Sequence, residues 1–266
     1  MEGKIRIEEH SLAPLQHYDS ASEDEYVSIL IEREKGTLAF KNIESFIFVN
    51  CFSHSRMNAL NWILQTRATL GFSFQTAYLS MAYFDRFLSK CSIDSGKCWK
   101  MRLLSIACLT LAAKMEESEV PVLTEFQSED YCFENKVIQR MELLVLSTLE
   151  WNMVMITPLV FLPYFITKLC NESQTCHVLS KTIQIIFTLI QEVNLMDHRP
   201  SVIAAAATLV AMDQHLTVES VKLKMSSIHE FRFLVAEDIF AYYDQIQSFY
   251  IEKENYKTQE KESYTQ

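Results

Sequence analysis

Cysteine and histidine are among the residue types that can hold a metal ion or act as a nucleophile, and the chain has seven of each. No two cysteines have the C-x-x-C spacing of zinc or redox sites, and His177 beside Cys176 is an isolated pair. The cysteine count is odd, and no charged-then-apolar signal peptide opens the sequence. We therefore expect reduced, mostly buried thiols in a cytosolic or nuclear protein, with no metal and no cofactor. The cysteines are Cys51, Cys91, Cys98, Cys108, Cys132, Cys170 and Cys176.

Sequence signatures of catalysis are missing as well. The four glycines stand apart, so they cannot form a G-x-G-x-x-G dinucleotide loop or a phosphate-binding loop. The sequence contains no H-E-x-x-H and no nucleophile-elbow motif. Because Ser/His/Asp triads assemble in space, an enzyme with an unrecognised site stays open as an alternative. These absences predict a protein that acts by docking against another protein and is not an enzyme.

Asp85 is a carboxylate on the predicted apolar stripe of a helix, four residues after Met81 and seven after Tyr78. A carboxylate buried there without a partner would be costly. Arg56, near the start of the preceding helix, is the natural partner, and we expect a buried ion pair. The alternative interpretation places Asp85 at the edge of the stripe, where it reaches water.

Charged residues also end the most apolar helix of the first half, where Lys114 is followed by Glu116 and Glu117. A lysine near a helix C-terminus suits the helix dipole, so this cluster has an ordinary explanation. Glu142 comes one residue after an apolar position of a later helix. Taken alone, it is best interpreted as a solvated charge on a helix face.

Long helices joined by short connections have to position these residues. The chain has only four Gly and five Pro in 266 residues, and 49% of it is hydrophobic, which predicts an all-α fold with a substantial core. A net charge of −10 argues against binding to nucleic acid, and no apolar run reaches the ~18 residues of a membrane span. Apolar periods predict a short helix opened by Asp24, and then helices at about 55–70, 73–88, 99–115, 134–149, 158–169, 175–195, 200–214 and 235–252.

Two of these helices are apolar nearly all round, at about 99–115 and 200–212, which predicts that each is the central helix of its own bundle. Their spacing of about 100 residues is a weak internal repeat of a whole domain. Between them, Thr157 and Pro158 suit the N-cap and first position of a helix, so we expect a cap and not a regulatory phosphorylation site. The predicted parts are an N-terminal segment at 1–54 with a short helix, helical domains at 55–152 and 153–252, and a disordered tail at 253–266.

Several short segments, in order, resemble the cyclin box, and specifically that of the plant D-type cyclins. These segments are Trp62-Ile63-Leu64, Ala82-Tyr83-Phe84-Asp85-Arg86-Phe87-Leu88, Leu111-Ala112-Ala113-Lys114-Met115-Glu116-Glu117, Arg140-Met141-Glu142-Leu143-Leu144-Val145-Leu146 and Leu149-Glu150-Trp151. The run from Trp62 to Phe74 is most similar to the fifth plant D-type subgroup. The half that starts at Pro158 resembles the C-terminal cyclin fold, though less distinctively.

The resemblance implies two consecutive cyclin-box domains of about five helices each. It also implies a regulatory subunit that binds and activates a cyclin-dependent kinase in G1/S control of the cell cycle. Cyclins press on the mobile helix of the kinase and bind its active state better, which shifts the kinase population toward that state. A cyclin-dependent kinase and kinase inhibitor proteins are the implied partners, and the nucleus, with the cytoplasm, is the implied location.

The resemblance also assigns roles to individual residues. By position, Lys114 and Glu142 match the paired charges with which cyclins contact the kinase. Arg56 and Asp85 match the family's buried Arg–Asp pair, in agreement with the position of Asp85 on its stripe. With the two acidic neighbours of the lysine included, the implied kinase-binding residues are Lys114, Glu116, Glu117 and Glu142.

Two features depart from the family pattern. Plant D-type cyclins bind retinoblastoma-related protein through L-x-C-x-E, which is absent here; the nearest text, at 130–134, lacks the leucine, so this partner is not expected. The usual substrate-docking patch keeps its Arg and Trp but has lost its large aliphatic residues, each worth roughly 1.5–3 kcal/mol of burial. We therefore expect weak binding of Arg-x-Leu peptides at this eroded patch, which comprises Ser55, Asn58, Ala59 and Trp62.

Two other classes of protein fit the helical pattern. A helical repeat of the transcription-factor type would bind DNA, but the acidic balance and the lack of Lys/Arg clusters weigh against it. A helical scaffold without a kinase partner should show a 34–47-residue period, which the sequence lacks.

Overall fold

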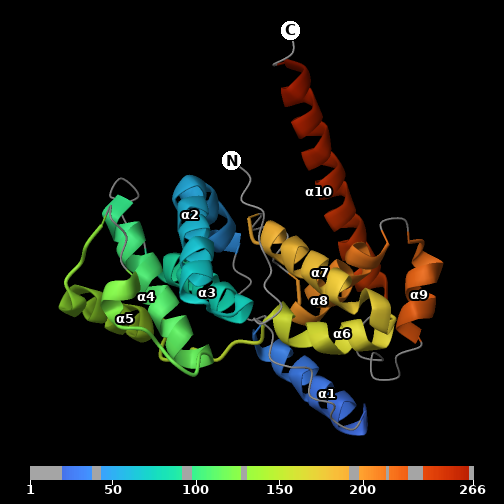
Figure 1. The fold of residues 1–266 in the computed structure, drawn as a ribbon, viewed down its shortest axis with the longest axis horizontal. Coiled ribbons are helices and arrows are strands. Elements are labelled where there is room, and N and C mark those ends of the chain that lie inside the picture. Colours follow the sequence, from blue (N-terminus) through green and yellow to red (C-terminus); the bar gives the residue numbers. More distant parts are fainter. Residues whose placement is uncertain are drawn as a thin grey trace. The chain divides into compact units, whose positions relative to one another are not determined.

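The structure is a computed structural model that describes the backbone of residues 20–37, 43–91, 98–126, 131–191, 198–213, 216–226 and 236–263. Side chains are described in the same ranges except at 20–22, 35–37, 43–53, 172, 218, 226 and 251–263. The regular structure of these residues is helical (Figure 1), which confirms the predicted all-α fold. The chain divides into two compact units: the described residues from Ile43 to Thr157, and the first helix together with the described residues from Pro158 onward.

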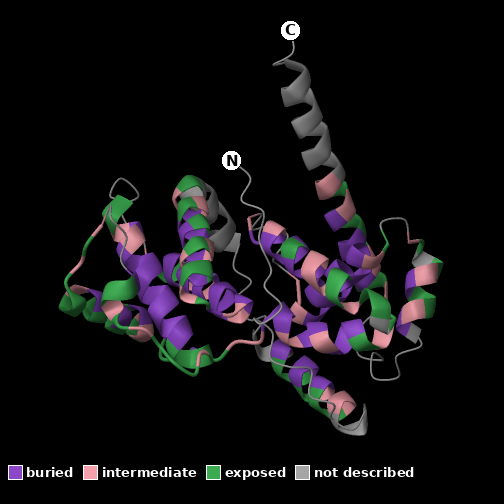
Figure 2. Ribbon diagram, in the orientation of Figure 1, coloured by how far each residue is buried: buried purple, intermediate pink, exposed green. Residues whose placement is uncertain are grey.

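The first unit is a bundle around α4 (Cys98–Glu116). This helix packs against α2 (Ile43–Leu70), α3 (Phe74–Lys90) and α5 (Asn135–Thr148), and the short 3-10 helix η3 (Leu123–Phe126) precedes α5. Every residue of α4 from 103 to 113 is buried, as the purple run along it in Figure 2 shows. A helix that is apolar all round is stable only when other helices surround it, so the predicted central position of this helix is confirmed.

The connection between α2 and α3 follows from three residues. Gly71 ends α2 with a φ of 71°, in the left-handed region that glycine adopts without steric cost. Ser73 is the N-cap of α3, and its side-chain oxygen accepts the backbone N–H of Thr76 at 3.2 Å. The end of α2 and the start of α3 therefore agree with the helices expected at about 55–70 and 73–88.

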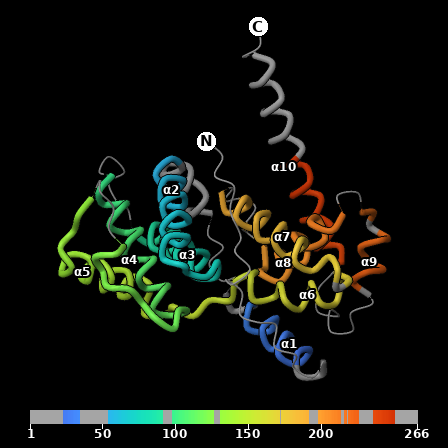
Figure 3. The backbone as a smooth tube through the Cα atoms, viewed as in Figure 1, coloured from blue at the N-terminus to red at the C-terminus, as the bar shows by residue number. Residues whose placement is uncertain are grey.

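The second unit is built around α8 (Pro200–Met212), whose residues from Ser201 to Ala211 are all buried. Four small alanines in a row allow neighbouring helices to approach closely, and α6, α7 and α10 pack against it. The other elements of this unit are α1 (Ser20–Thr37), η4 (Pro158–Phe161), α6 (Leu162–Leu169), η5 (Glu172–Gln174), α7 (Thr175–Leu189), α9 (Val218–Ser226) and α10 (Ala236–Ser263). The backbone course of each unit can be followed in Figure 3.

Helix α1 belongs to the second unit although it precedes the first in sequence. Glu34 of α1 is fully buried and accepts two hydrogen bonds from Ser201, from the backbone N–H at 2.9 Å and from the hydroxyl at 2.5 Å. Ser201 lies in the first turn of α8, where backbone N–H groups and the helix dipole favour a carboxylate. Asp24 accepts a hydrogen bond from Tyr164 at 2.9 Å and pairs with Lys168 at 3.1 Å, so two more contacts attach α1 to this unit.

Several sequence-based boundaries need correction. The predicted N-terminal segment at 1–54 contains the longer α1 and the first twelve residues of α2, because the Phe/Ile-rich stretch after Ile43 is part of that helix. Residues 1–19 and 38–42 lie outside the described residues. Helix α9 was not predicted. The tail at 253–266 was predicted to be disordered, but α10 extends to Ser263, and Glu, Lys and Gln are good helix formers.

Thr157 does not act as the predicted helix cap. A capping hydroxyl accepts a backbone N–H, but the hydrogen bond described for the Thr157 hydroxyl is the one that it donates to the side-chain oxygen of Gln75 on α3, at 2.6 Å. The residue is fully buried, and the segment that follows is the 3-10 helix η4. The expectation that Thr157 is not a phosphorylation site stays a prediction.

The described cysteines are free thiols, but the prediction that they are mostly buried is wrong. Cys108 of α4 is buried, and this burial, followed by the nearby Asp85 carboxylate, raises the pKa of its thiol. The others are half-buried (Cys91 and Cys170) or exposed (Cys98, Cys132 and Cys176); the side chain of Cys51 lies outside the described residues. Among the helices that the structure describes, none has the length and apolarity to cross a membrane.

Candidate functional site

Arg56 and Asp85 form the predicted ion pair between α2 and α3. The guanidinium donates from Nε to Oδ1 at 2.8 Å and from Nη2 to Oδ2 at 2.7 Å, so the pair is bidentate. The arginine side chain is 4% exposed and the aspartate side chain 31% exposed. The pair is therefore buried on its cationic side and reaches water on its anionic side.

Lys114 and Glu142 form a second ion pair, between α4 and α5. The Lys114 Nζ lies 2.6 Å from Glu142 Oε1, and the Thr110 hydroxyl donates to the same oxygen at 2.6 Å. The lysine side chain is 45% exposed, but that of Glu142 is only 8% exposed. The interpretation of Glu142 as a solvated charge on a helix face is therefore wrong.

This arrangement fixes one cation at the surface. Thr110 lies one helical turn before Lys114, so both residues face α5 from the same side of α4. The buried carboxylate accepts from both and holds the ammonium in one place. A lysine restrained in this way loses less conformational entropy on binding than a freely mobile one.

Glu117 lies at a different place from the Lys114–Glu142 pair, although it follows Lys114 by three residues. Its carboxylate accepts the backbone N–H of Ser73 at 2.8 Å and the hydroxyl of Thr76, both at the start of α3. An anion is favoured at a helix N-terminus, so Glu117 ties the end of α4 to the beginning of α3. This role could not be read from the sequence, because the partners lie 44 and 41 residues away.

Glu116 is exposed at the end of α4. Partial burial of its carboxyl group, followed by the charge of Glu117, raises the pKa of Glu116. Burial, followed by the Glu116 charge, also raises the pKa of the Tyr83 phenol. The end of α4 therefore lies close to Tyr83 of α3.

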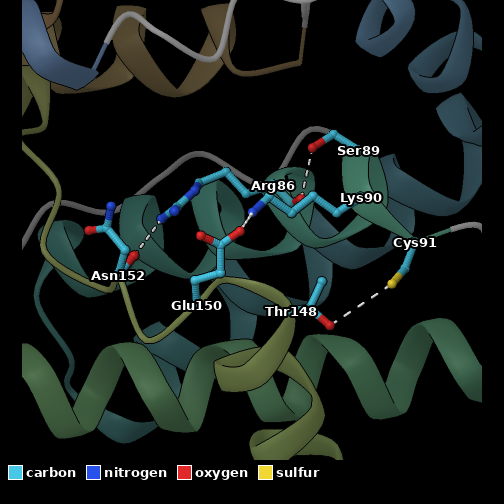
Figure 4. Close-up of polar contacts among 7 residues, drawn as sticks. All are labelled: Arg86, Ser89, Lys90, Cys91, Thr148, Glu150 and Asn152. Carbon is cyan, nitrogen blue, oxygen red and sulfur yellow. Dashed lines mark hydrogen bonds and ion pairs between the residues drawn. The ribbon is translucent and has the colours of Figure 1, made fainter.

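The turn after α5 is held against the end of α3 by several polar contacts, most of which Figure 4 shows. Lys90 Nζ lies 2.7 Å from Glu150 Oε1, and Arg86 donates to the carbonyl of Asn152 at 2.9 Å. The hydrogen bond from Lys90, followed by its charge, lowers the pKa of Glu150. Glu150 and Trp151 have φ values of 56° and 60°, which non-glycine residues rarely adopt. These contacts hold the left-handed turn, and Trp151 is 66% exposed on it.

Among the described residues, large exposed apolar side chains are more frequent in the first unit than in the second. Those flanking the Lys114–Glu142 pair in sequence are Met115, 49% exposed, and Leu143, 57% exposed. A protein surface that binds a partner combines apolar side chains with a few placed charges. The other large apolar residues that the structure shows as exposed in this unit are Trp99, Val120, Val122, Leu144, Trp151 and Val154.

The four residues of the predicted eroded docking patch meet at one pocket between α2 and α4. The pocket has a volume of about 550 Å³. Trp62 is only 8% exposed, and the Arg102 guanidinium carbon lies 4.9 Å from the centre of its indole ring. The lining consists of Ser55, Asn58, Ala59, Asn61, Trp62, Gln65, Cys98, Met101, Arg102, Ser105 and Tyr131.

Comparison with known proteins identifies the family to which the chain belongs. Residues 27–154 match the family described as "Cyclin, N-terminal domain" and residues 156–266 match "Cyclin, C-terminal domain". A solved viral cyclin from herpesvirus saimiri shares the fold, with a TM-score of 0.65 over 82% of this chain and 95% of that one, at 14% identity.

Curated relatives give the branch of the family. Cyclin-D5-1 of Arabidopsis thaliana is 39% identical over 80% of this chain and 68% of its own length. Cyclin-D5-1 of Oryza sativa subsp. japonica is 42% identical over 74% of this chain and 55% of its own length. The chain thus spans about half to two thirds of these relatives. It belongs to the cyclin family, in the plant D-type branch that includes the D5 cyclins.

Proposed function

We propose that this chain binds a cyclin-dependent kinase and activates it in G1/S control of the cell cycle. The main support for this proposal is the position of the Lys114 ammonium, which the buried Glu142 and Thr110 hold at the surface. Cyclins are regulatory subunits, so the chain supplies a contact surface and the kinase supplies the catalytic groups. Kinase inhibitor proteins as partners, and a nuclear and cytoplasmic location, stay predictions of the family resemblance.

The charge of Lys114 suits the C-terminal end of a partner helix, where backbone carbonyl oxygens carry partial negative charge. An ammonium group has three N–H donors, of which Glu142 accepts one. Since Glu142 already orders the lysine, a kinase helix that docks here meets a preformed donor. Met115 and Leu143 would exclude water around that contact, which strengthens it.

The kinase is activated if this chain binds the state in which the kinase's mobile helix is docked better than the state in which that helix is displaced. A difference of ~2.7 kcal/mol in binding free energy shifts that equilibrium about 100-fold. Of the residues predicted to bind the kinase, Lys114 and Glu116 are exposed enough for direct contact. Glu142 acts by positioning the lysine, and Glu117 acts by bracing α4 against α3.

The proposal is tested by co-purifying the chain with plant cyclin-dependent kinases and measuring phosphorylation of histone and of retinoblastoma-related protein. We expect the wild-type chain to activate at least one such kinase. Lys114→Ala should lose most of this activation, and Lys136→Ala, which removes an exposed lysine of α5, should keep it. Failure of every kinase to bind would overturn the proposed function, and full activation by Lys114→Ala would overturn the assigned contact.

A further inference from the structure

Helix α5 has an exposed row of side chains on the side away from the buried Glu142. Lys136, Arg140 and Leu144 stand four residues apart, so they form one row along the helix, and all three are exposed. Ile138 and Glu142, which lie two positions from members of this row, are buried. With 3.6 residues per turn, residues two positions apart point about 200° away from each other. The outer row, defined as Lys136, Arg140 and Leu144, therefore faces away from the side of α5 that Glu142 occupies.

The outer row carries both cations of α5 and no carboxylate. The acids of this segment are Glu142 and the N-cap residue Glu134, and each stands four residues from the buried Ile138, on the inner row. Neither Lys136 nor Arg140 forms an ion pair with another residue that the structure describes. The outer row is thus locally positive, although the chain as a whole has a net charge of −10.

We propose that the outer row of α5 binds an acidic amphipathic helix of a further partner protein. A guanidinium binds a carboxylate in a bidentate manner, so Arg140 supplies the directional contact and Lys136 adds a second cation one turn before it. Leu144 is 48% exposed and lies one turn after Arg140, so a helix that runs along α5 meets two charges and then an apolar side chain. The row from 136 to 144 is about 12 Å long, which roughly two turns of a partner helix cover.

Charge decides which partner fits this row. A nucleic acid needs a broad basic surface, and two cations on a chain of net charge −10 do not provide one. A symmetric contact between two copies of this chain would bring two positive rows together. An acidic helix neutralises the row, and its affinity comes from close contacts because more distant charges are screened beyond about 8 Å at physiological salt.

The docking proposed here does not require the kinase. The Lys114 ammonium, which the proposed function assigns to the kinase contact, lies against Glu142 on the inner row. Because the two rows face opposite sides of α5, both partners can bind at the same time. The inference thus goes beyond the proposed function and can be tested without it.

Fluorescence polarisation with the full chain tests the proposal. Three labelled helical peptides share a stripe of leucines and differ only in the residues that flank it, which are Glu, Gln or Lys. We expect the Glu peptide to bind about tenfold tighter than the Gln peptide, and the Lys peptide to bind weakest. The double variant Lys136→Gln, Arg140→Gln should remove the preference for Glu. Arg33→Gln, which changes an exposed arginine of α1, should keep it.

A second variant separates the apolar contact from the charges and from the fold. Leu144→Gln should weaken the binding of all three peptides several-fold and keep their order, with the melting temperature nearly unchanged because the side chain is exposed. Equal or tighter binding of the Lys peptide by the wild type would overturn the proposal, as would no binding of any peptide. So would an unchanged preference in the double variant, or tighter binding of a single-stranded oligonucleotide than of the Glu peptide.

The same measurement distinguishes this row from the kinase contact. The Glu peptide should bind equally well to the chain alone and to the chain saturated with kinase. Loss of the peptide on saturation would assign the row to the kinase and overturn the proposal of a further partner. The measurements on the chain alone involve no kinase, so failure of the proposed function would leave their outcome unaffected.

Discussion

Arg56–Asp85 and Lys114–Glu142 are both ion pairs between consecutive helices of the first unit, but their burial is reversed. In the first pair the cation is 4% exposed and the anion 31% exposed. In the second the cation is 45% exposed and the anion 8% exposed. A pair with a buried cation presents mainly its carboxylate edge, whereas a pair with a buried anion presents an ordered ammonium at the surface.

The largest effect on stability should come from removing the acid of the first pair. Asp85→Ala leaves the buried Arg56 without this carboxylate, and we expect a loss of about 3 kcal/mol in the free energy of unfolding. Glu150→Ala removes the acid of the exposed Lys90–Glu150 pair and should leave the melting temperature nearly unchanged. Urea titration of both variants measures the difference. A loss for Asp85→Ala as small as for Glu150→Ala would show that the buried cation does not depend on this partner.

Removing the acid of the second pair should cost less. In Glu142→Ala the ammonium of Lys114 can be hydrated, and the Thr110 hydroxyl can donate its one proton to the Ala107 carbonyl, which lies 3.0 Å away. We expect a loss of about 1–2 kcal/mol in the free energy of unfolding. Gln139→Ala, at an exposed position of the same helix, is the control. If Glu142→Ala proved more damaging than Asp85→Ala, the ranking by burial of the cation would be wrong.

The smallest effect concerns Glu116 and has a defined pH dependence. Its pKa is raised from the ordinary value of 4.5, so the folded state holds this proton more tightly than the unfolded state. The ionised group therefore destabilises the fold at neutral pH, and the cost disappears below pH 4.5. Glu116→Gln should raise stability by under about 1 kcal/mol at pH 7, since the group is largely exposed. Thermal melts at pH 7 and pH 4 check the sign, with Glu119→Gln as control; a gain that persists at pH 4 would contradict it.

The sequence predicted the first pair better than the second for a geometric reason. Asp85 stands on a regular apolar stripe, where a charge is conspicuous. The position of Glu142 directly after an apolar residue says little about its burial, because the residues on the same face of a helix lie one turn away. Ile138 and Val145, at −4 and +3, are both buried, so Glu142 lies on the buried face of α5.

Other contacts had no local signal in the sequence. Glu117 bonds to the start of α3, Glu34 to the start of α8, and Thr157 to Gln75, each across more than 40 residues. Such partners depend on how helices pack and not on the period of any one helix. The periodicity did predict the central helices, since an apolar surface all round requires neighbours on every side.

The most direct test of the account compares the two pairs in their affinity for the kinase. Dissociation constants are measured by calorimetry for wild type, Lys114→Ala and Asp85→Ala, at a temperature where all three are folded. We expect Lys114→Ala to bind at least about tenfold more weakly, although it also loses some stability because the buried Glu142 carboxylate is left without its cation. Asp85→Ala should bind as wild type does despite its lower stability. Unchanged affinity in Lys114→Ala, or an equal loss in Asp85→Ala, would contradict the assignment of the exposed cation to the partner and the buried cation to the fold.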